Sequence, residues 1–429
     1  MTVRTRGGIH LAAHLPGGGG LIARTGSYEG PRTGSYEGPR TRSYEGPPND
    51  PYEGPRTDFA SFEHLARTAE RGLFDFLLLT ESPRPREHRG TTHDPGVVGH
   101  PEPLTVLHGL AAVTGRLGLA AAVGAGSDES YGLARRLATL DHLSGGRAAW
   151  ATVTSRDTVP GEDLRRDGAP DPADRRRGGS RPTRTTEAAL ARSAEFIERA
   201  RELWESCPPE GVPRASARRG RRVDVAGEFG VPRSPQGHPV IIHADGSGGG
   251  REFAASTAEV VITRHRTPQA GREFRADMER RLATYGRAPG DLKIMPAVTV
   301  VLGDTTAEAR ERAADIRRQG ISEGDLTVAP QEIRGAGLSS YDPDGPLPEA
   351  YGPPSYVGTP EAVAAELDAF VTAGAADGFV LVPRPAPGGL DEFVDRVVPL
   401  LQERGAFRTE YTGTTLRSHL GSARPLWKG

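Results

Sequence analysis

The sequence has very little cysteine and lysine. Cys207 is the single cysteine among 429 residues, and Lys293 and Lys428 are the only lysines among the 54 basic residues. One cysteine excludes an internal disulfide framework, and it excludes zinc or iron–sulfur sites that need several thiolates. We therefore expect a cytoplasmic protein whose chemistry depends on other side chains or on a cofactor.

Long apolar runs and an excess of one charge are also missing. No stretch approaches the ~18 consecutive apolar residues of a membrane span, and the first ten residues lack the apolar segment of a signal peptide. The 54 basic and 56 acidic residues balance to a net charge of −2, so the chain carries no overall cationic field for a phosphate backbone. We expect neither a membrane nor a nucleic acid as a partner.

An octapeptide repeat occupies residues 25–56. Its units, TGSYEGPR and its variants, place Tyr28, Tyr36, Tyr44 and Tyr52 in one register. A unit with one aromatic residue and a Gly-Pro break cannot bury a core by itself, so turns or polyproline-like segments are expected. The repeat is either a lid or partner-binding tract or an expanded loop insertion. The second interpretation is favoured, because compositional repeats carry little functional information.

Outside the repeat, short apolar runs alternate with segments of helical periodicity. Strands are predicted at residues 9–15, 74–79, 117–123, 148–154, 240–244, 260–263, 294–302 and 379–382. Helices are predicted at residues 59–69, 102–114, 131–142, 186–204, 252–256, 267–285, 305–318, 360–373 and 390–404. Eight strands, each followed by a helix or an equivalent segment, favour a closed (β/α)8 TIM barrel over an open doubly wound sheet.

The predicted barrel is interrupted by insertions. Residues 1–24 are expected to form the first barrel strand and its loop, 25–56 the repeat insertion, 57–405 the remainder of the barrel and 406–429 a C-terminal tail. Two regions rich in Arg, Gly and Pro, residues 156–185 and 208–237, have little periodicity and are predicted to be surface excursions.

A glycine-rich turn follows the predicted strand at residues 240–244. Ser247 and the glycines Gly248, Gly249 and Gly250 open a helix, so the hydroxyl and the backbone amides could converge on an anion. A phosphate cradle and an ordinary flexible turn fit the sequence equally well. An earlier glycine pattern at residues 18–23 is not followed by a helix, so a dinucleotide-binding fold is not expected.

Charged and imidazole side chains also occur near strand ends. Glu81, Asp128 and Glu129 come just after strands, where a barrel displays residues in its mouth, although each fits a solvated loop charge as well. His10 and His14 share one face of the first strand. No carboxylate at matching spacing accompanies the two histidines, so no metal site is predicted.

Several long motifs occur in a fixed order. They include ERGLFDFLLL at residues 70–79, LARRLATLDHLSGGRAAW at 133–150, VPRSPQGHPVIIHA at 231–244 and VGTPEAVAAELDAFV at 357–371. In these motifs the chain resembles the bacterial-luciferase-like flavin monooxygenases, and within them the branch of nitrilotriacetate and dibenzothiophene sulfone monooxygenases and pristinamycin synthase. The resemblance covers most of the chain outside the repeat and the two excursions.

The resemblance implies a function and a site. It implies a (β/α)8 barrel that takes reduced FMN from a separate flavin reductase and uses O2 to oxygenate a small organic substrate. It implies a homo-oligomer, and it implies that Ser247 and the amides of Gly248, Gly249 and Gly250 hold the flavin phosphate. The family pattern also implies that three residues line the barrel mouth, namely Glu81, Asp128 and Trp150.

The chain departs from the family pattern at cofactor-contacting positions. Ala151 replaces an asparagine, Asp128 replaces another, and Leu190 stands near the position of a tyrosine. Two alternatives therefore stay open. One is a non-catalytic relative that serves as a partner subunit or binding protein, and the other is a flavin-independent enzyme that uses Glu81, Asp128 and Glu129 as acids and bases.

Overall fold

The structure analysed is a computed structural model. It describes residues 8–15, 59–80, 101–124, 130–153, 182–206, 215–219, 224–244, 246–322, 355–383 and 389–427. The octapeptide repeat lies outside the described residues, as do Glu81, Asp128, Glu129 and most of the first predicted excursion.

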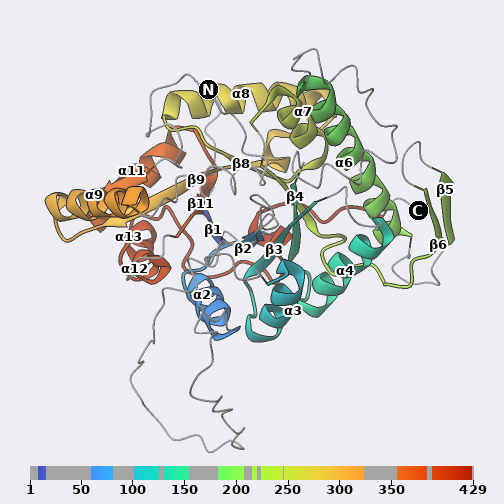
Figure 1. Ribbon diagram of the computed structural model, residues 1–429, viewed down its shortest axis with the longest axis horizontal. Coiled ribbons are helices and arrows are strands. Elements are labelled where there is room, and N and C mark those ends of the chain that lie inside the picture. Colours follow the sequence, from blue (N-terminus) through green and yellow to red (C-terminus); the bar gives the residue numbers. More distant parts are fainter. Residues whose placement is uncertain are drawn as a thin grey trace, which may run out of the picture.

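Eight parallel strands close into a barrel. They are β1 (His10–Leu15), β2 (Phe76–Thr80), β3 (Gly118–Gly124), β4 (Ala148–Val153), β7 (Val240–His243), β8 (Val260–Thr263), β9 (Lys293–Leu302) and β11 (Gly378–Leu381). Each pairs with the next in this order, and β11 pairs with β1, which closes the ring seen near the centre of Figure 1. The structure thus confirms the predicted (β/α)8 barrel.

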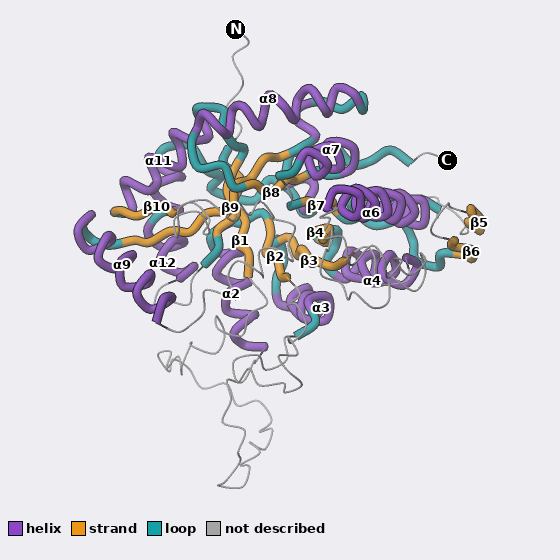
Figure 2. The backbone as a smooth tube through the Cα atoms, turned by 45° about the horizontal axis from the view of Figure 1, so that its top comes forward, coloured by secondary structure: helices purple, strands orange, loops and turns teal. Residues whose placement is uncertain are grey.

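Helices surround the barrel on its outer side, as Figures 1 and 2 show. They are α2 (Phe59–Arg71), α3 (Pro103–Val113), α4 (Ser130–Leu143), α6 (Pro182–Glu205), α7 (Gly248–Thr257), α8 (Pro268–Thr284), α9 (Thr306–Ser322), α11 (Pro360–Thr372), α12 (Gly389–Arg396) and α13 (Val398–Glu403). No helix among the described residues is long and apolar enough to cross a membrane.

Several short elements were not predicted, among them the 3-10 helix η2 (Pro289–Asp291). A hairpin of β5 (Ala215–Arg219) and β6 (Asp224–Glu228) lies within the second excursion, at the periphery beside α6 in Figures 1 and 2. β10 (Ser355–Gly358) pairs with the end of β9 outside the closed ring. The helix α14 (Leu416–His419) lies in the segment set apart as a tail.

One predicted helix is divided in two. The segment predicted at residues 390–404 forms α12 and α13, which meet at Val397. Pro399 follows at the start of α13, where its missing N–H costs nothing because the first turn of a helix has no acceptor for it.

Alternating side chains on each strand separate two apolar layers. On β4, Ala149 and Ala151 belong to the barrel interior, whereas Ala148 and Trp150 pack toward the helices. The interior is rich in small residues; its alanines are Ala12, Ala120, Ala122, Ala149, Ala151 and Ala297. This period of two decides which residues can reach a ligand inside the barrel.

The LSGGR motif at residues 143–147 makes the turn between α4 and β4. Gly145 and Gly146 have φ of 69° and 91°, a left-handed conformation that glycine adopts without a steric penalty. The buried Arg147 side chain that follows donates to Thr114 Oγ1 at 2.9 Å and to the Leu117 carbonyl at 2.7 Å. The motif therefore ties α4 and β4 to the turn that precedes β3.

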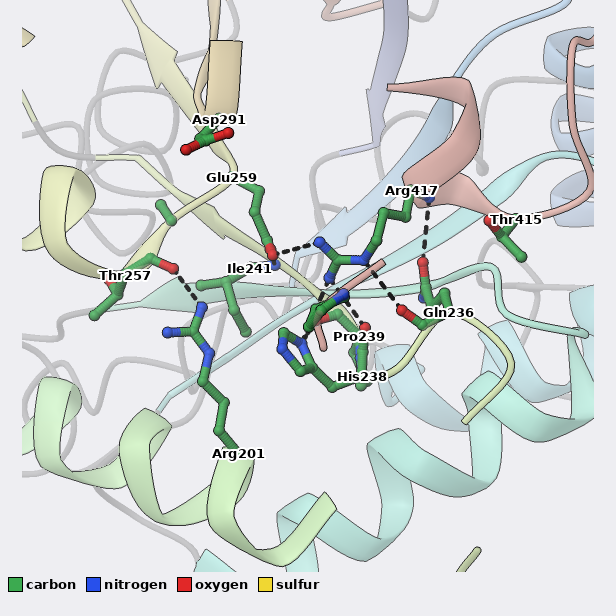
Figure 3. Close-up of polar contacts among 12 residues, drawn as sticks. Arg201, Gln236, His238, Pro239, Ile241, Thr257, Glu259, Asp291, Thr415 and Arg417 are labelled. Carbon is green, nitrogen blue, oxygen red and sulfur yellow. Dashed lines mark hydrogen bonds and ion pairs between the residues drawn. The ribbon is translucent and has the colours of Figure 1, made fainter. Parts of the chain in front are cut away.

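The C-terminal segment closes the amino-terminal end of the barrel. Leu416 and Leu420, both fully buried, belong to the barrel-interior cluster. Between them, Arg417 is buried and donates from Nη1 to Glu259 Oε1 at 2.6 Å and from Nε to the Gln236 carbonyl at 3.2 Å (Figure 3). Residues 408–420 therefore form the floor of the barrel.

Candidate active site

Ser247 caps the amino terminus of α7 at the barrel mouth. Its backbone is extended (φ −64°, ψ 162°), and its Oγ accepts a hydrogen bond from the Gly250 amide at 3.0 Å. Ser247, Gly248 and Gly249 are exposed, whereas Gly250 is buried. Because the turn follows β7, it lies at the carboxyl ends of the strands, where barrel enzymes carry their sites.

The geometry of this turn fits a phosphate group. The first amides of a helix have no acceptor within the helix. The Ser247 hydroxyl accepts from the Gly250 amide at 3.0 Å, and the Ser247 carbonyl accepts from the Arg251 amide at 2.9 Å. Among the described residues, no acceptor is recorded for the amides of Gly248 and Gly249, so both can donate to a ligand. A Cβ added at Gly248 would meet nothing within 4 Å, so this side of the turn is open. Open amides and the positive end of the helix dipole favour an oxyanion.

Leu190 packs against the same turn. It comes from α6, is 6% exposed, and its Cδ1 would lie 2.9 Å from a Cβ added at Gly249. The position that sequence analysis placed near the family's tyrosine is therefore next to the α7 turn. A leucine there supplies an apolar contact and no hydroxyl.

Trp150 faces away from the barrel interior. Its indole N–H donates to the Val123 carbonyl at 3.0 Å, and its ring packs edge to face on Phe196 of α6 at 5.5 Å. The side chain is fully buried in the layer between strands and helices. Trp150 packs β4 against α6 and so fixes the position of Ala151, the next residue, which faces the barrel interior. We propose that Trp150 has this packing role and does not contact a cofactor.

Ala151 occupies the inner face of β4. It is 5% exposed and lies in the strand register between Ala122 of β3 and Ile242 of β7. Its methyl group offers no hydrogen bond where the family pattern has an amide.

His14 was not predicted as a site residue, yet it lies inside the barrel mouth. Ala12 belongs to the interior cluster, so His14, two residues further along β1, projects to the same side near the carboxyl end of the strand. Its Nε2 is hydrogen bonded to Thr80 Oγ1 of β2. Burial lowers the pKa of His14 to about 4, so the imidazole is neutral at physiological pH. The alternation from Ala12 is the sequence signal that could have found it.

His10 lies at the opposite end of the same strand. Its Nδ1 is 3.2 Å from Asp75 Oδ2, and Arg408 Nη1 is 3.0 Å from Asp75 Oδ1. Burial would raise the pKa of Asp75, but His10 and Arg408 lower it to about 2. No group of three or more metal-ligating side chains occurs among the described residues.

Arg264 is a second residue that sequence analysis missed. It follows β8 directly, and its Nε is buried with no hydrogen-bond partner. The sequence signal is its place one residue beyond a barrel strand, in the run Thr263-Arg264-His265-Arg266.

A cavity of about 390 Å³ lies between the ends of β9 and β11 and the helices α9 and α12. Its lining is largely apolar, with Arg312, Asp315 and Glu392 as charged members. None of the predicted site residues lines it, and Arg312 is already paired with Glu308 and Glu392. We therefore place the site at the α7 turn and not in this cavity.

Comparison with known proteins decides the family. Residues 41–377 match the family model described as luciferase-like monooxygenase. The chain belongs to the luciferase-like monooxygenase family. This membership confirms the resemblance seen in the sequence motifs, and it makes the chain a flavin-dependent monooxygenase by class.

The luciferase-like relatives match over nearly their whole length. Nitrilotriacetate monooxygenase component A of Aminobacter aminovorans is 34% identical, over 86% of this chain and 91% of the relative. Dibenzothiophene-sulfone monooxygenase of Rhodococcus erythropolis is also 34% identical, over 87% and 92%. The solved structure of a long-chain alkane monooxygenase matches with a TM-score of 0.74 and 26% identity, over 100% of this chain and 97% of that one.

Proposed function

We propose that this luciferase-like monooxygenase binds reduced FMN in its barrel mouth and uses O2 to oxygenate a small organic substrate. The observation that carries the proposal is the α7 turn, where the Ser247 hydroxyl and the amides of Gly248 and Gly249 form an exposed oxyanion cradle at the carboxyl end of β7. The cradle would hold the FMN phosphate.

The chain's own residues bind, orient and shield. The reduced flavin would supply the electrons for O2 chemistry, which no amino-acid side chain provides. His14 offers a neutral imidazole, fixed by Thr80, that can orient a polar group without adding charge. The small interior alanines below the mouth leave room above them, and the aromatic layer around Trp150 keeps water out of the wall. Glu81 and Asp128 remain proposed mouth residues by the family pattern.

A separate flavin reductase is part of this proposal. The described residues build one barrel with one mouth, and a relative named as component A of its monooxygenase is one part of a larger system. A cytoplasmic location, where reduced flavin is regenerated, and a homo-oligomeric state complete the proposal.

The test compares FMN with riboflavin, which lacks the phosphate. The purified protein is titrated anaerobically with each reduced flavin, and an O2 pulse then measures how much H2O2 escapes per flavin oxidised. We expect wild type to prefer FMN and Ser247→Ala to lower that preference about tenfold, because one hydrogen-bonding group is lost from the cradle.

Thr359→Ala is the matched control. Thr359 caps α11 and accepts from the Ala362 amide at 3.4 Å, so its loss removes the same kind of cap away from the proposed cradle. If both variants lose the same FMN affinity, the effect of Ser247→Ala comes from the lost helix cap and not from lost phosphate binding. Absence of flavin binding by wild type would favour the non-catalytic partner subunit, for which Ala151 and Leu190 are the structural arguments.

A further inference from the structure

Arg264 is a partly buried cation for which the described part of the chain supplies no counter-charge. Its Nε is inaccessible to solvent, and within the described ranges it has no hydrogen-bond partner and no carboxylate forms an ion pair with the side chain. Burial, together with the nearby charge of Arg266, lowers the pKa of Arg264 to about 10. The guanidinium is therefore still charged at neutral pH.

The local chain geometry turns Arg264 toward the barrel interior. Thr263 Oγ1 and His265 Nδ1 are 3.0 Å apart, so these two side chains lie on one side of the chain. The His265 ring stacks on Phe370 of α11 at 5.8 Å, which places that side in the outer layer. Arg264, between them, projects to the opposite side, the one shared by Ile262 of the interior cluster.

Arg264 and the α7 turn occupy the same sector of the mouth. β7 and β8 are adjacent, with His243 opposite Val261 in the register. Ser247 comes four residues after His243, and Arg264 comes three residues after Val261. Both therefore leave neighbouring strands at their carboxyl ends.

Other buried arginines in the described part of the chain have partners. Arg417 is paired with Glu259 at 2.6 Å, and Arg147 donates to carbonyls and a hydroxyl. A cation that is partly withdrawn from solvent without such partners is destabilising, so a ligand that supplies the missing charge would stabilise it. Arg264 is the arginine to which this argument applies.

We propose that Arg264 is the cationic residue of an oxyanion site in the β7–β8 sector of the barrel mouth. Its ligand is a phosphate or carboxylate group, which accepts two hydrogen bonds from a guanidinium. Two sources share this chemistry, the phosphate of FMN and an acidic group on the substrate. This proposal rests on the proposed function, because both place the site in the barrel mouth. Oxyanion binding can nevertheless be measured on the flavin-free protein.

The first experiment measures anion binding by the flavin-free protein. Calorimetric titrations with inorganic phosphate and with citrate are made on wild type, Arg264→Gln and Arg264→Lys. We expect Arg264→Gln to weaken binding about ten- to a hundredfold, and Arg264→Lys to weaken it less because the charge remains without the two-pronged geometry. Arg266→Gln is the matched control, since it removes the same charge from an exposed neighbour and should change affinity less than about threefold.

The second experiment identifies the source of the anion. If FMN supplies it, Arg264→Gln lowers FMN affinity and leaves riboflavin affinity unchanged. If the substrate supplies it, the ratio of FMN to riboflavin affinity stays constant, and citrate binding to the FMN-loaded protein is lost in Arg264→Gln. Either outcome supports the oxyanion site.

A stability measurement separates this role from a structural one. Removing an unpaired cation should leave the melting temperature of the ligand-free protein unchanged or raise it, whereas removing a structural arginine should lower it. The proposal is overturned if wild type binds neither anion, or if Arg264→Gln binds phosphate, citrate and FMN as wild type does. A third outcome separates the two proposals: wild type binds the anions but no flavin, and Arg264→Gln loses anion binding. That result would overturn the proposed function and still support the oxyanion site.

Discussion

Leu190 determines how many hydrogen-bond donors surround the α7 turn. Its side chain lies against Gly249 and contributes apolar contact only. A phenol at this position would add one donor beside the Gly248 and Gly249 amides, which fits the tyrosine of the family pattern. We therefore expect a tyrosine at this one position to increase the affinity for FMN.

Leu190→Tyr should raise the affinity for reduced FMN. One added hydrogen bond to a charged phosphate contributes about 1.5–3 kcal/mol, so we expect about a tenfold gain after the cost of fitting the larger ring beside Gly249. Riboflavin affinity should not change. Anaerobic titration measures both, and Leu190→Phe, which has the ring without the hydroxyl, is the control. Equal gains for Tyr and Phe would show that ring contact, not the phenol, is responsible.

Single residues of the site were predictable where local sequence determines their position. Ser247 could be found because a serine before glycines after a strand is a helix cap at a barrel mouth. Trp150 was predicted by motif to line the mouth, but its side chain packs toward the helices, because its direction depends on strand alternation in the closed barrel. His14 and Arg264 needed the same information, together with two contacts between elements: that of His14 with Thr80 of β2 and that of His265 with Phe370 of α11.

The floor segment depends on one ion pair. Burial would raise the pKa of Glu259, but Arg417 and other nearby cations hold it at about 2, so the pair is ionised across the physiological range. The pair connects the C-terminal segment to the turn before β8, as Figure 3 shows.

Arg417→Met should destabilise the fold strongly. It leaves the Glu259 carboxylate buried without its main cation, which costs about 3–5 kcal/mol. Urea unfolding measures the loss. Arg67→Met, which breaks the Arg67–Glu63 pair on the surface of α2, is the control and should cost less than about 1 kcal/mol. Similar losses in the two variants would contradict the role assigned to Arg417.

Elements were predictable where their apolar period is strong. All eight barrel strands and the helices of the ring were found, since buried runs and helical spacing recur along the chain. The β5–β6 hairpin was missed because Ala215–Arg219 and Asp224–Glu228 are short and charged, and the second of them contains a glycine. α14 was missed because four residues carry too little periodicity, and its burial comes from the barrel above it.

The pH dependence of stability belongs to the whole molecule. His14, His238 and His265 lie in the mouth, the floor and the outer layer, and burial lowers the pKa of each to about 4. Unfolded histidines ionise near pH 6.5, so between these values the unfolded chain binds more protons, and stability falls as the pH is lowered. Burial raises the pKa of Asp141 from 3.8 to about 6. Between these pH values the folded chain binds more protons at Asp141 than the unfolded chain, so this group adds stability as the pH is lowered.

We expect a net loss of about 2 kcal/mol or more between pH 7 and pH 4.5, because three histidines outweigh one aspartate. Urea unfolding at the two pH values measures it. His14→Gln should make the loss smaller, because it removes one of the three buried imidazoles. A loss unchanged in His14→Gln would mean that His14 ionises alike in the folded and unfolded chain.

The floor also has a consequence for biosynthesis. β11 completes the ring with residues 378–381, yet Leu416 and Leu420, which cover its open end, are translated later. A chain whose translation stops between residues 381 and 416 would contain all eight barrel strands and would still expose the apolar interior. Proteases and chaperones recognise exposed apolar surface of this kind. We therefore expect a chain that stops before residue 416 to be degraded or bound by chaperones more readily than the full chain.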